Sequence, residues 1–317
     1  MKYITLALGA SMLLGTTVSA HDMCRVGSLK GPTSMGLVNF MHDEETDDDP
    51  QYSFSMVTAA DELVAQFTGD QIDIALLPAN VASVLYNKTK GGIQVIDINT
   101  LGVLYLVTAD TSISSVADLK GKTVYTTGKG QTPEYALNYL LAANDLTTDD
   151  VTVEFKSEAT EVVSVLAQDS SAIGVLPQPF ATVACQQNES LQMVSDLTAE
   201  WDSTGNGTMV TGVTVAKKSF IEANPECIEE FLDEHEDSAE DAREDVEETA
   251  ELVAAYGIIE KAPVAAKALP KCNITYLDND AMKTALSGYL QVLYDQNPES
   301  IGGELPGDDF YYYNLED

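Results

Sequence analysis

Basic residues are scarce in this sequence. Its 317 residues include 16 Lys and Arg against 51 Asp and Glu, which gives a formal net charge of −35 at pH 7. A surface of this charge repels nucleic acid and anionic membranes, so we expect neither as a partner. The excess of acid is compatible with adaptation to salt, where counter-ions screen self-repulsion, and equally with a need for solubility. It describes the surface and does not identify a function.

Histidine and cysteine are also scarce, with three and four residues respectively. Their spacings match no zinc pattern, so we predict no metal site, and no motif calls for a cofactor. The cysteines at positions 24, 185, 227 and 272 allow three disulfide pairings, between which the sequence cannot choose. We prefer Cys227 with Cys272, because both lie in the C-terminal part; free buried thiols are the alternative.

Long apolar runs are absent after the first 20 residues. Residues 3–18 are apolar and are followed by Val18-Ser19-Ala20, a pattern typical of a secretory signal cleaved after Ala20. The alternative is a buried N-terminal helix. Met23 stands where a lipoprotein signal has a small residue, which argues against a lipid anchor at Cys24. We therefore expect an exported protein, periplasmic or at the outer face of the cell membrane.

One glycine-bearing segment has the form of a binding loop. An apolar strand ends near Tyr125, Gly128 and Gly130 follow, and a helix is expected to begin at Pro133 with Thr132 as its N-cap. The unpaired N–H groups of such a helix start can hold an anion or a carbonyl oxygen. A connection capped for stability alone is the alternative. The segment lacks the third glycine of a dinucleotide site and the Gly-Lys-Ser/Thr end of a P-loop.

Strands and helices alternate along the chain, which predicts an α/β fold with mainly parallel sheets flanked by helices. The expected strands are residues 25–29, 52–57, 72–77, 93–98, 101–107, 122–125, 151–155, 172–176, 191–197 and 210–216. The expected helices are 35–41, 60–67, 81–86, a single turn at 114–119, one that begins at 133 with an apolar face through 141, 158–167, one from about 180, 219–223, 225–256, 263–268 and 280–294. Residues 201–207 are expected to form a polar, glycine-rich loop.

The pattern restarts near residue 110 and later returns to helices, which predicts two lobes. We expect a signal peptide at 1–20, the first part of lobe I at 21–107, lobe II at 108–209, and a return to lobe I at 210–317. Ligands of open parallel sheets collect at the carboxyl ends of the strands. Four such ends, two from each lobe, would face one another across a cleft, a common place for a small-molecule site.

Four segments resemble a known family: residues 31–36 (GPTSMG), 73–80 (DIALLPAN), 118–124 (DLKGKTV) and 128–133 (GKGQTP). They resemble the substrate-binding proteins of ABC importers, in particular the nitrate/sulfonate/taurine-type, NMT1/THI5-like group. The resemblance covers essentially the whole mature chain. It implies a two-lobed periplasmic-binding-protein type II fold, closure of the lobes around a small-molecule ligand, and delivery to an ABC permease in the membrane. We also expect a monomer without catalytic residues.

The resemblance also indicates where ligand contacts should lie. They are Thr33, Ser34, Met35, Asn80, Asn99, Thr100, Lys129, Gly130, Thr132 and Gln178, with Trp201 as a candidate stacking residue. Thr33, Ser34 and Thr132 could instead only cap helices, Asn80 and Gln178 could only tie loops together, and Trp201 could belong to the core.

Arginine is nearly absent from the predicted cleft, although a bidentate arginine would suit a sulfonate or carboxylate. The chain has only Arg25, at a strand start away from the cleft, and Arg243, on an acidic helix; Lys30 and Lys129 are the cations nearest the loops. We therefore expect a neutral ligand, or an anion held mostly by backbone N–H groups.

Two other functions remain open on the sequence. One is an enzyme on the same fold, such as a chorismate-dehydratase-like lyase or a pyrimidine synthase, although only Glu134 lies near a loop as a candidate acid or base. The other is a sensor or adhesin domain that binds ligand without transport. We expect a non-enzymatic receptor, because export and the absence of a nucleophile–base pair argue against the enzymes.

Overall fold

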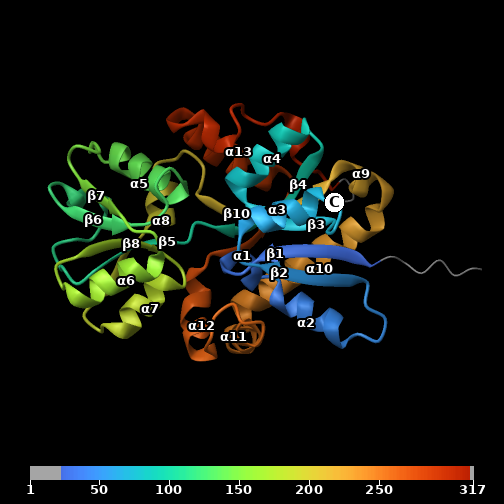
Figure 1. The fold of residues 1–317 in the computed structure, drawn as a ribbon, viewed down its shortest axis with the longest axis horizontal. Helices are drawn as coiled ribbons and strands as arrows, with labels where there is room; N and C mark the ends of the chain where they lie inside the picture. Colours follow the sequence, from blue (N-terminus) through green and yellow to red (C-terminus); the bar gives the residue numbers. More distant parts are fainter. Residues whose placement is uncertain (1–22, 315–317) are drawn as a thin grey trace, which may run out of the picture.

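A computed structural model describes residues 23–314 of the chain. It contains two sheets, one of six strands and one of five, each flanked by helices. Figure 1 shows the two lobes side by side, with the second lobe in green and the first built from both chain ends. The predicted signal segment, residues 1–20, lies outside the described residues.

The first lobe is assembled from two separate stretches of chain. The N-terminal stretch contains β1 (Cys24–Leu29), α1 (Pro32–Met35), α2 (Val38–Thr46), β2 (Tyr52–Val57), α3 (Ala60–Thr68), β3 (Ile74–Pro78), α4 (Ala79–Thr89) and β4 (Ile93–Leu101). The C-terminal stretch contains β10 (Val210–Lys217), α9 (Lys218–Ala223), α10 (Pro225–Glu244), α11 (Val246–Ala255), α12 (Ala262–Ala268), β11 (Ile274–Leu277) and α13 (Asn279–Gln296).

The second lobe is formed by the middle of the chain. Its elements are β5 (Leu104–Thr108), β6 (Thr123–Thr126), α5 (Thr132–Ala143), β7 (Thr152–Phe155), α6 (Ala159–Gln168), β8 (Ile173–Pro177), α7 (Phe180–Gln187), β9 (Gln192–Asp196) and α8 (Leu197–Asp202). The central strands are almost wholly apolar, because both faces of each sheet are covered by helices. In β8, for example, the four residues from Ile173 to Leu176 are all buried.

Both sheets are mixed, which corrects the prediction of mainly parallel sheets. The strand orders are β11-β4-β10-β3-β1-β2 and β7-β6-β8-β5-β9. β1 pairs in parallel with β2 and β3, whereas β10 lies antiparallel between β3 and β4. In the second sheet β5 is antiparallel to β8 and β9. The physical reason is that β5 and β10 each enter a lobe directly from the other lobe, without the helix that would reverse the chain for parallel pairing.

The lobes are joined by two short segments. Leu101 at the end of β4 pairs with Val210, whereas Leu104 at the start of β5 pairs with Pro177 of the second sheet. The predicted boundary at residue 107 is therefore too late in the chain, because it assigns β5 to the first lobe. We propose residues 102–103 as the first crossing and 203–209 as the second.

Three local predictions also need correction. The helix expected at 225–256 is divided into α10 and α11 at Asp245, whose backbone is not helical (φ −105, ψ 57). β11 was not predicted, since Ile274–Leu277 is short and is recognised as a strand only by its pairing with β4. Trp201 lies in α8 and not in a loop; Asp196 caps that helix by accepting a hydrogen bond from the N–H of Thr198.

The disulfide joins Cys24 to Cys227, and the expected Cys227–Cys272 pairing is wrong. Cys227 lies in the first turn of α10, beside Tyr52 on β2, whose hydroxyl donates to the Cys227 carbonyl at 2.8 Å. That position brings it next to the start of β1, the neighbouring strand. Cys272 is fully buried instead, and its thiol donates to the carbonyl of Ala268. Proximity in sequence misled the prediction, because a 20-residue helix carries the chain about 30 Å.

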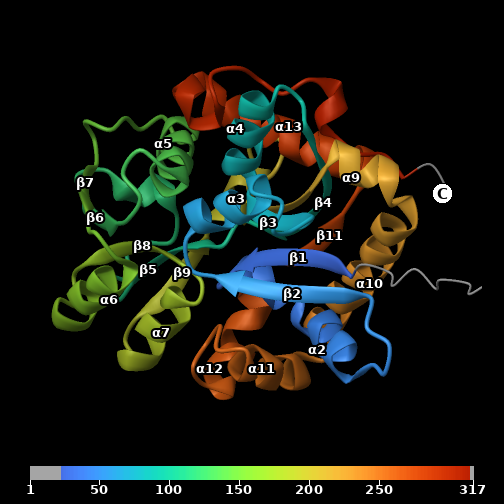
Figure 2. The ribbon, with the colours of Figure 1, turned by 45° about the vertical axis from the view of Figure 1, so that its right-hand side comes forward.

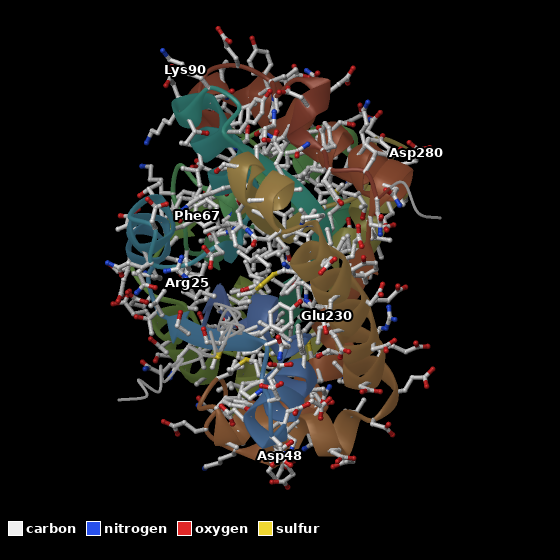
Figure 3. The ribbon with its side chains drawn as sticks, turned by 90° about the vertical axis from the view of Figure 1, so that its right-hand side faces the viewer. Arg25, Asp48, Phe67, Lys90, Glu230 and Asp280 are labelled. Carbon is white, nitrogen blue, oxygen red and sulfur yellow. A yellow bond between two sulfur atoms is a disulfide. The ribbon has the colours of Figure 1, made fainter. Side chains whose placement is uncertain are left out.

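The exposed side of α10 is acidic (Figure 3, beside the labelled Glu230). Its buried face carries Ile228, Phe231, Leu232, His235, Ala239 and Ala242. This three-to-four-residue spacing is that of an amphipathic helix. Partial burial, and then repulsion from Asp237, raises the pKa of Glu234. Partial burial raises the pKa of Asp241 in the same way, with repulsion from Asp245 as the next cause.

We predict that mild acid stabilises the protein. A carboxyl whose pKa is raised by folding binds its proton more readily in the folded state, so Glu234 and Asp241 add stability as pH falls from about 7.5 toward about 5.5. The opposite contribution of Asp110, whose pKa is lowered to about 2 mainly by hydrogen bonds from Ser112, begins to be lost only nearer its ordinary value of about 3.9. In low salt the melting temperature should be higher at the lower pH, on the order of a few degrees.

Salt provides the control for this pH effect. In about 1 M NaCl the Debye length falls to about 3 Å, so repulsion among the α10 carboxylates is screened and the pH difference should shrink. Sorbitol at the same osmolality should not shrink it. A melting temperature that is equal at the two pH values in low salt, or lower at pH 5.5, would contradict the prediction.

Candidate functional site

A cleft of about 470 Å³ lies between the two lobes. Its size falls within the range typical of small-molecule sites, about 300–1,000 Å³. The residues that line it are Ala60, Asp61, Pro78, Asn80, Val81, Val103, Leu104, Gln131, Thr132, Pro133, Pro177, Met209 and Thr211. They come from both lobes and from both crossing segments. A ligand held there would contact both lobes at once.

Strand ends bring these residues together. The carboxyl ends of β3 and β8 supply Pro78 and Pro177. β5 and β10 run in the opposite direction to those strands, so their amino ends lie at the same sheet edges and supply Leu104 and Thr211. Figure 2 shows α3 and α4 in front of the first sheet, and the starts of these two helices complete the wall with Ala60, Asp61, Asn80 and Val81. The cleft is therefore bordered by facing edges of the two sheets.

The glycine loop before α5 forms the wall on the second lobe. Gly128 and Gly130 have positive φ angles of 74° and 72°, a region that glycine adopts without strain. The N–H of Gly130 donates to a carboxylate oxygen of Glu134, and the N–H of Gln131 donates to the Gly128 carbonyl at 2.9 Å. The loop thus uses these donors internally, and Gln131, Thr132 and Pro133 face the cleft.

The end of α13 holds this loop from the opposite lobe. The Asn297 side-chain amide donates to the Tyr135 hydroxyl at 2.9 Å, and that hydroxyl donates to the Gly130 carbonyl at 3.0 Å. Gln296 donates to the Tyr135 carbonyl at 3.0 Å, and α13 reaches α5 again where the Tyr289 hydroxyl lies 3.4 Å from that of Thr132. In Figure 1 α13 lies at the top of the first lobe, and one end of it approaches α5. These contacts hold the lobes together at one side of the cleft.

Of the residues predicted to contact ligand, Asn80 and Thr132 line the cleft. Asn80 is half-buried in the first turn of α4, and its side-chain amide lies 3.4 Å from the Ser300 carbonyl. Thr132 is not the N-cap that was predicted, because α5 begins at Thr132 itself and is preceded by Gln131 without a side-chain cap. Its position one residue inside the helix leaves its hydroxyl near Tyr289 and the cleft.

The three predicted contacts on α1 are buried. Ser34 donates to the hydroxyl of Ser28 at 2.8 Å, and Thr33 donates to the Leu29 carbonyl at 3.3 Å. Neither caps the helix, since Gly31 occupies the cap position without a side-chain hydrogen bond. Met35 packs in the core, where its sulfur lies 3.6 Å from the sulfur of Cys272. None of the three lines the cleft as described, and their ligand role stays a prediction.

Asn99 and Thr100 belong to a buried polar chain in the first sheet. Thr100 donates to Asn99 at 2.9 Å, and Asn99 donates to the hydroxyl of Thr214 at 3.1 Å. Thr214 in turn donates to Asp97 at 2.8 Å, and Nδ1 of His235 lies 3.2 Å from the other oxygen of Asp97. Both predicted residues are at most 2% exposed. These hydrogen bonds connect β4 to β10 and α10, and none of their residues lines the cleft.

The remaining predicted contacts also lie off the cleft wall. Lys129 directs its ammonium toward the Phe155 ring, 5.8 Å from the centroid, and Gly130 lies one residue before the lining segment. Gln178 is buried in the second lobe, where it accepts from Thr182 at 2.8 Å. Trp201 is fully buried, with Tyr139 at 4.1 Å between ring centroids. The role of these four residues as ligand contacts remains a prediction.

Several lining residues were not anticipated, notably Leu104, Met209 and Thr211. The prediction considered only the carboxyl ends of parallel strands. Because β5 and β10 are antiparallel to their neighbours, their amino ends also lie at the cleft. The signal that could have located them is the position of both strands beside the two predicted lobe boundaries, at residues 107 and 209.

Comparison with solved structures shows the same architecture in other proteins. An ABC transporter from Parabacteroides distasonis superposes with a TM-score of 0.79 at 24% identity, over 92% of this chain and 99% of that one. The periplasmic aliphatic sulphonate binding protein SsuA from Escherichia coli superposes with a TM-score of 0.73 at 17% identity, over 92% of each chain. At these identities the similarity concerns the fold. The predicted two-lobed periplasmic-binding-protein fold is therefore confirmed, except that its sheets are mixed and not mainly parallel.

Of the two sequence comparisons, one identifies a family. No curated protein sequence matches the chain. The sequence profile described as NMT1/THI5 like matches residues 90–249, which is half of the chain and runs from the end of α4 through the whole second lobe to α11. The chain therefore belongs to the NMT1/THI5-like family.

Proposed function

We propose that this protein is an exported solute-binding receptor that captures a small molecule between its lobes and hands it to an ABC importer. The observation that carries the proposal is the cleft of about 470 Å³, whose wall is built from both lobes and both crossing segments. A ligand that touches both lobes stabilises the closed form over the open one, and that difference is what a permease can recognise.

The relatives support this role. The family match covers the second lobe, and the fold neighbours include a periplasmic aliphatic sulphonate binding protein and an ABC transporter. The leader-like first 20 residues support export to the periplasm or the outer face of the membrane. Within residues 23–314 no helix is long and apolar enough to cross a membrane. We propose that the receptor works as a monomer.

Catalysis on the same fold receives no support from the cleft wall. Among the described residues that line it, Asp61 is the one ionisable side chain, and it is exposed at the start of α3. General acid–base catalysis needs a group whose pKa is tuned by its surroundings, usually paired with a second group. Nδ1 of His235 lies 3.2 Å from Asp97, but both side chains are fully buried and neither lines the cleft. We therefore propose binding without chemistry.

A thermal-shift screen tests the receptor function. The compounds would be alkanesulfonates, nitrate, aromatic acids, pyrimidines, riboflavin, and neutral or cationic amphiphiles, each at millimolar concentration. A ligand with a dissociation constant 1,000-fold below its concentration stabilises the folded state by about 4 kcal/mol, which raises the melting temperature clearly. A screen in which no compound shifts the melting temperature would count against the receptor function.

Removing one hydroxyl between the lobes should weaken binding. Tyr135→Phe deletes the group that accepts from Asn297 and donates to Gly130, so it loosens the closed form and the glycine loop together. Of the two bonds, the one to Asn297 joins the lobes, and its net loss of about 0.5–1.5 kcal/mol corresponds to an affinity about threefold to tenfold lower. The loss should appear in the dissociation rate, measured by stopped-flow mixing with a ligand from the screen.

The matched control for this variant is Tyr125→Phe. Tyr125, on β6, is another tyrosine of the second lobe. It is half-buried under the Lys156 ammonium and lies away from the first lobe. Its dissociation rate should equal that of the unaltered protein. If Tyr135→Phe also releases ligand at the unaltered rate, these contacts do not hold the closed form.

A further inference from the structure

We propose that the cleft accepts ligands that have an apolar body and no negative charge, and that it rejects sulfonates and other anions. This inference rests on the proposed receptor function and concerns the ligand class of the same site. It separates this chain from the sulphonate-binding protein whose fold it shares. The argument depends on the cleft wall, on the nearest cations and on the glycine loop.

The cleft wall is apolar with a single carboxylate. Side chains of Val81, Leu104, Met209 and three prolines make up much of it, and within residues 23–314 neither Lys nor Arg lines it. Among the described residues that line it, Asp61 has the one charged side chain. Burying an anion without a counter-charge or hydrogen-bond donors costs several kcal/mol. The wall therefore favours neutral and cationic groups.

The cations nearest to the loops are directed elsewhere. Lys129 lies over Phe155 at the outer edge of the second sheet. Lys30 approaches Gly257, at the end of α11. Arg25 is at the amino end of β1, where it pairs with Asp73 at 2.7 Å. None of the three lines the cleft in the described structure, so none can neutralise a bound sulfonate there.

The glycine loop does not replace those cations. Backbone N–H groups at a helix start can hold an anion, but here the Gly130 N–H already binds the carboxylate of Glu134. The Gln131 N–H binds the Gly128 carbonyl. The facing helix α3 carries Asp61 and Glu62 in its own first turn, where they occupy the positive end of its dipole. Protein carboxylates thus take two of the places that a ligand anion could use, the Gly130 N–H and the start of α3.

Uncharged polar groups remain available for a ligand at the wall. Asn80, Gln131, Thr132 and Thr211 carry amides and hydroxyls, which pair with neutral donors and acceptors. Asp61 adds attraction for a cation, and the formal net charge of −35 extends that preference over the whole molecule. The site thus fits an apolar molecule whose polar end is neutral or positively charged.

Three probes with one hexyl chain test the proposal: hexanamide, hexylammonium and hexanesulfonate. Binding would be measured by isothermal titration calorimetry up to about 10 mM probe, a range that covers millimolar dissociation constants. Hexanamide and hexylammonium should bind, and hexanesulfonate should bind at least about tenfold more weakly than either. Thr211→Trp, which fills the cleft, should remove the binding; this separates the cleft from adsorption of hexylammonium to the acidic surface.

Two variants test the role of Asp61. Asp61→Asn should lower the preference for hexylammonium over hexanamide about fivefold. Glu62→Gln removes the neighbouring charge, which does not line the cleft, and should leave that preference unchanged. An equal loss of preference in both variants would show general attraction by the helix and would refute the assignment to Asp61.

The outcomes distinguish the ligand class from the receptor function. Hexanesulfonate binding as tightly as the other two probes, in a manner that Thr211→Trp abolishes, would overturn the ligand class and leave the receptor function standing. Absence of binding by both hexanamide and hexylammonium would also overturn the ligand class. The receptor function would fail separately, if the broad thermal-shift screen produced no ligand at all.

Discussion

Thr211→Trp is expected to reduce ligand affinity at least about 100-fold, or about 2.7 kcal/mol. Thr211 is half-buried at the start of β10, directly after the second crossing segment, and lines the cleft. An indole there takes up the space of the ligand body and keeps the lobes from closing around it. The protein should remain folded, because the new ring extends into the cleft. Calorimetry with a ligand from the screen measures the loss, and circular dichroism checks the fold.

Two controls make this result specific. Thr211→Ser keeps a small side chain with a hydroxyl and should bind within a factor of about three. Thr160→Trp places the same indole on the exposed face of α6 and should bind normally. If Thr211→Trp bound as well as Thr160→Trp, the ligand would occupy another place, and the cleft would lose its assignment.

Removal of the disulfide is expected to destabilise the protein by about 3 kcal/mol. Cys24 and Cys227 are 203 residues apart, so the bond closes a very long loop and restricts the unfolded chain strongly. It also ties the first strand to the start of α10, both from the first lobe. The double variant Cys24→Ala with Cys227→Ala should therefore unfold at a lower urea concentration.

Reducing agent and a free cysteine provide the controls. Dithiothreitol should lower the urea midpoint of the unaltered protein toward that of the double variant, and should not change the double variant itself. Cys185→Ala removes a half-buried free thiol and should change the midpoint little. A double variant as stable as the unaltered protein would mean that native contacts alone hold β1 against α10.

Most strands and helices could be predicted because local patterns specify them. The apolar run ending at Leu77, and the spacing of Phe231, Leu232 and His235 on α10, are visible in the sequence. The motifs at residues 31–36 and 118–124 led to the family that the profile match then established. In these places the short-range pattern and the fold agree.

The predicted ligand residues were less informative about the cleft wall. Asn80 and Thr132 lie on it, whereas Asn99, Thr100 and Gln178 are buried in hydrogen-bond networks beside it. A polar residue after a strand can turn toward the cleft or into the core. Which it does depends on partners such as Thr214 and Thr182 from distant parts of the chain, which a local pattern does not show.

The glycine loop illustrates the same limit. From the sequence its open backbone N–H groups were candidates for holding an anion. The structure shows that Glu134, four residues after Gly130, occupies one of them, and that Tyr135 links the loop to Asn297 of the other lobe. The first contact could have been inferred from the spacing, but the second could not, because it joins residues 162 positions apart.

The sequence by itself determined the alternation of strands and helices, the two lobes, the family and the lack of cations near the cleft, because each depends on composition or on patterns within about 20 residues. Only the tertiary structure decided the partner of Cys24, the place of β5 in the second sheet, and the contribution of the amino ends of β5 and β10 to the cleft. These depend on strand order and direction, which are set by contacts between segments far apart in the chain, where a local pattern carries no information.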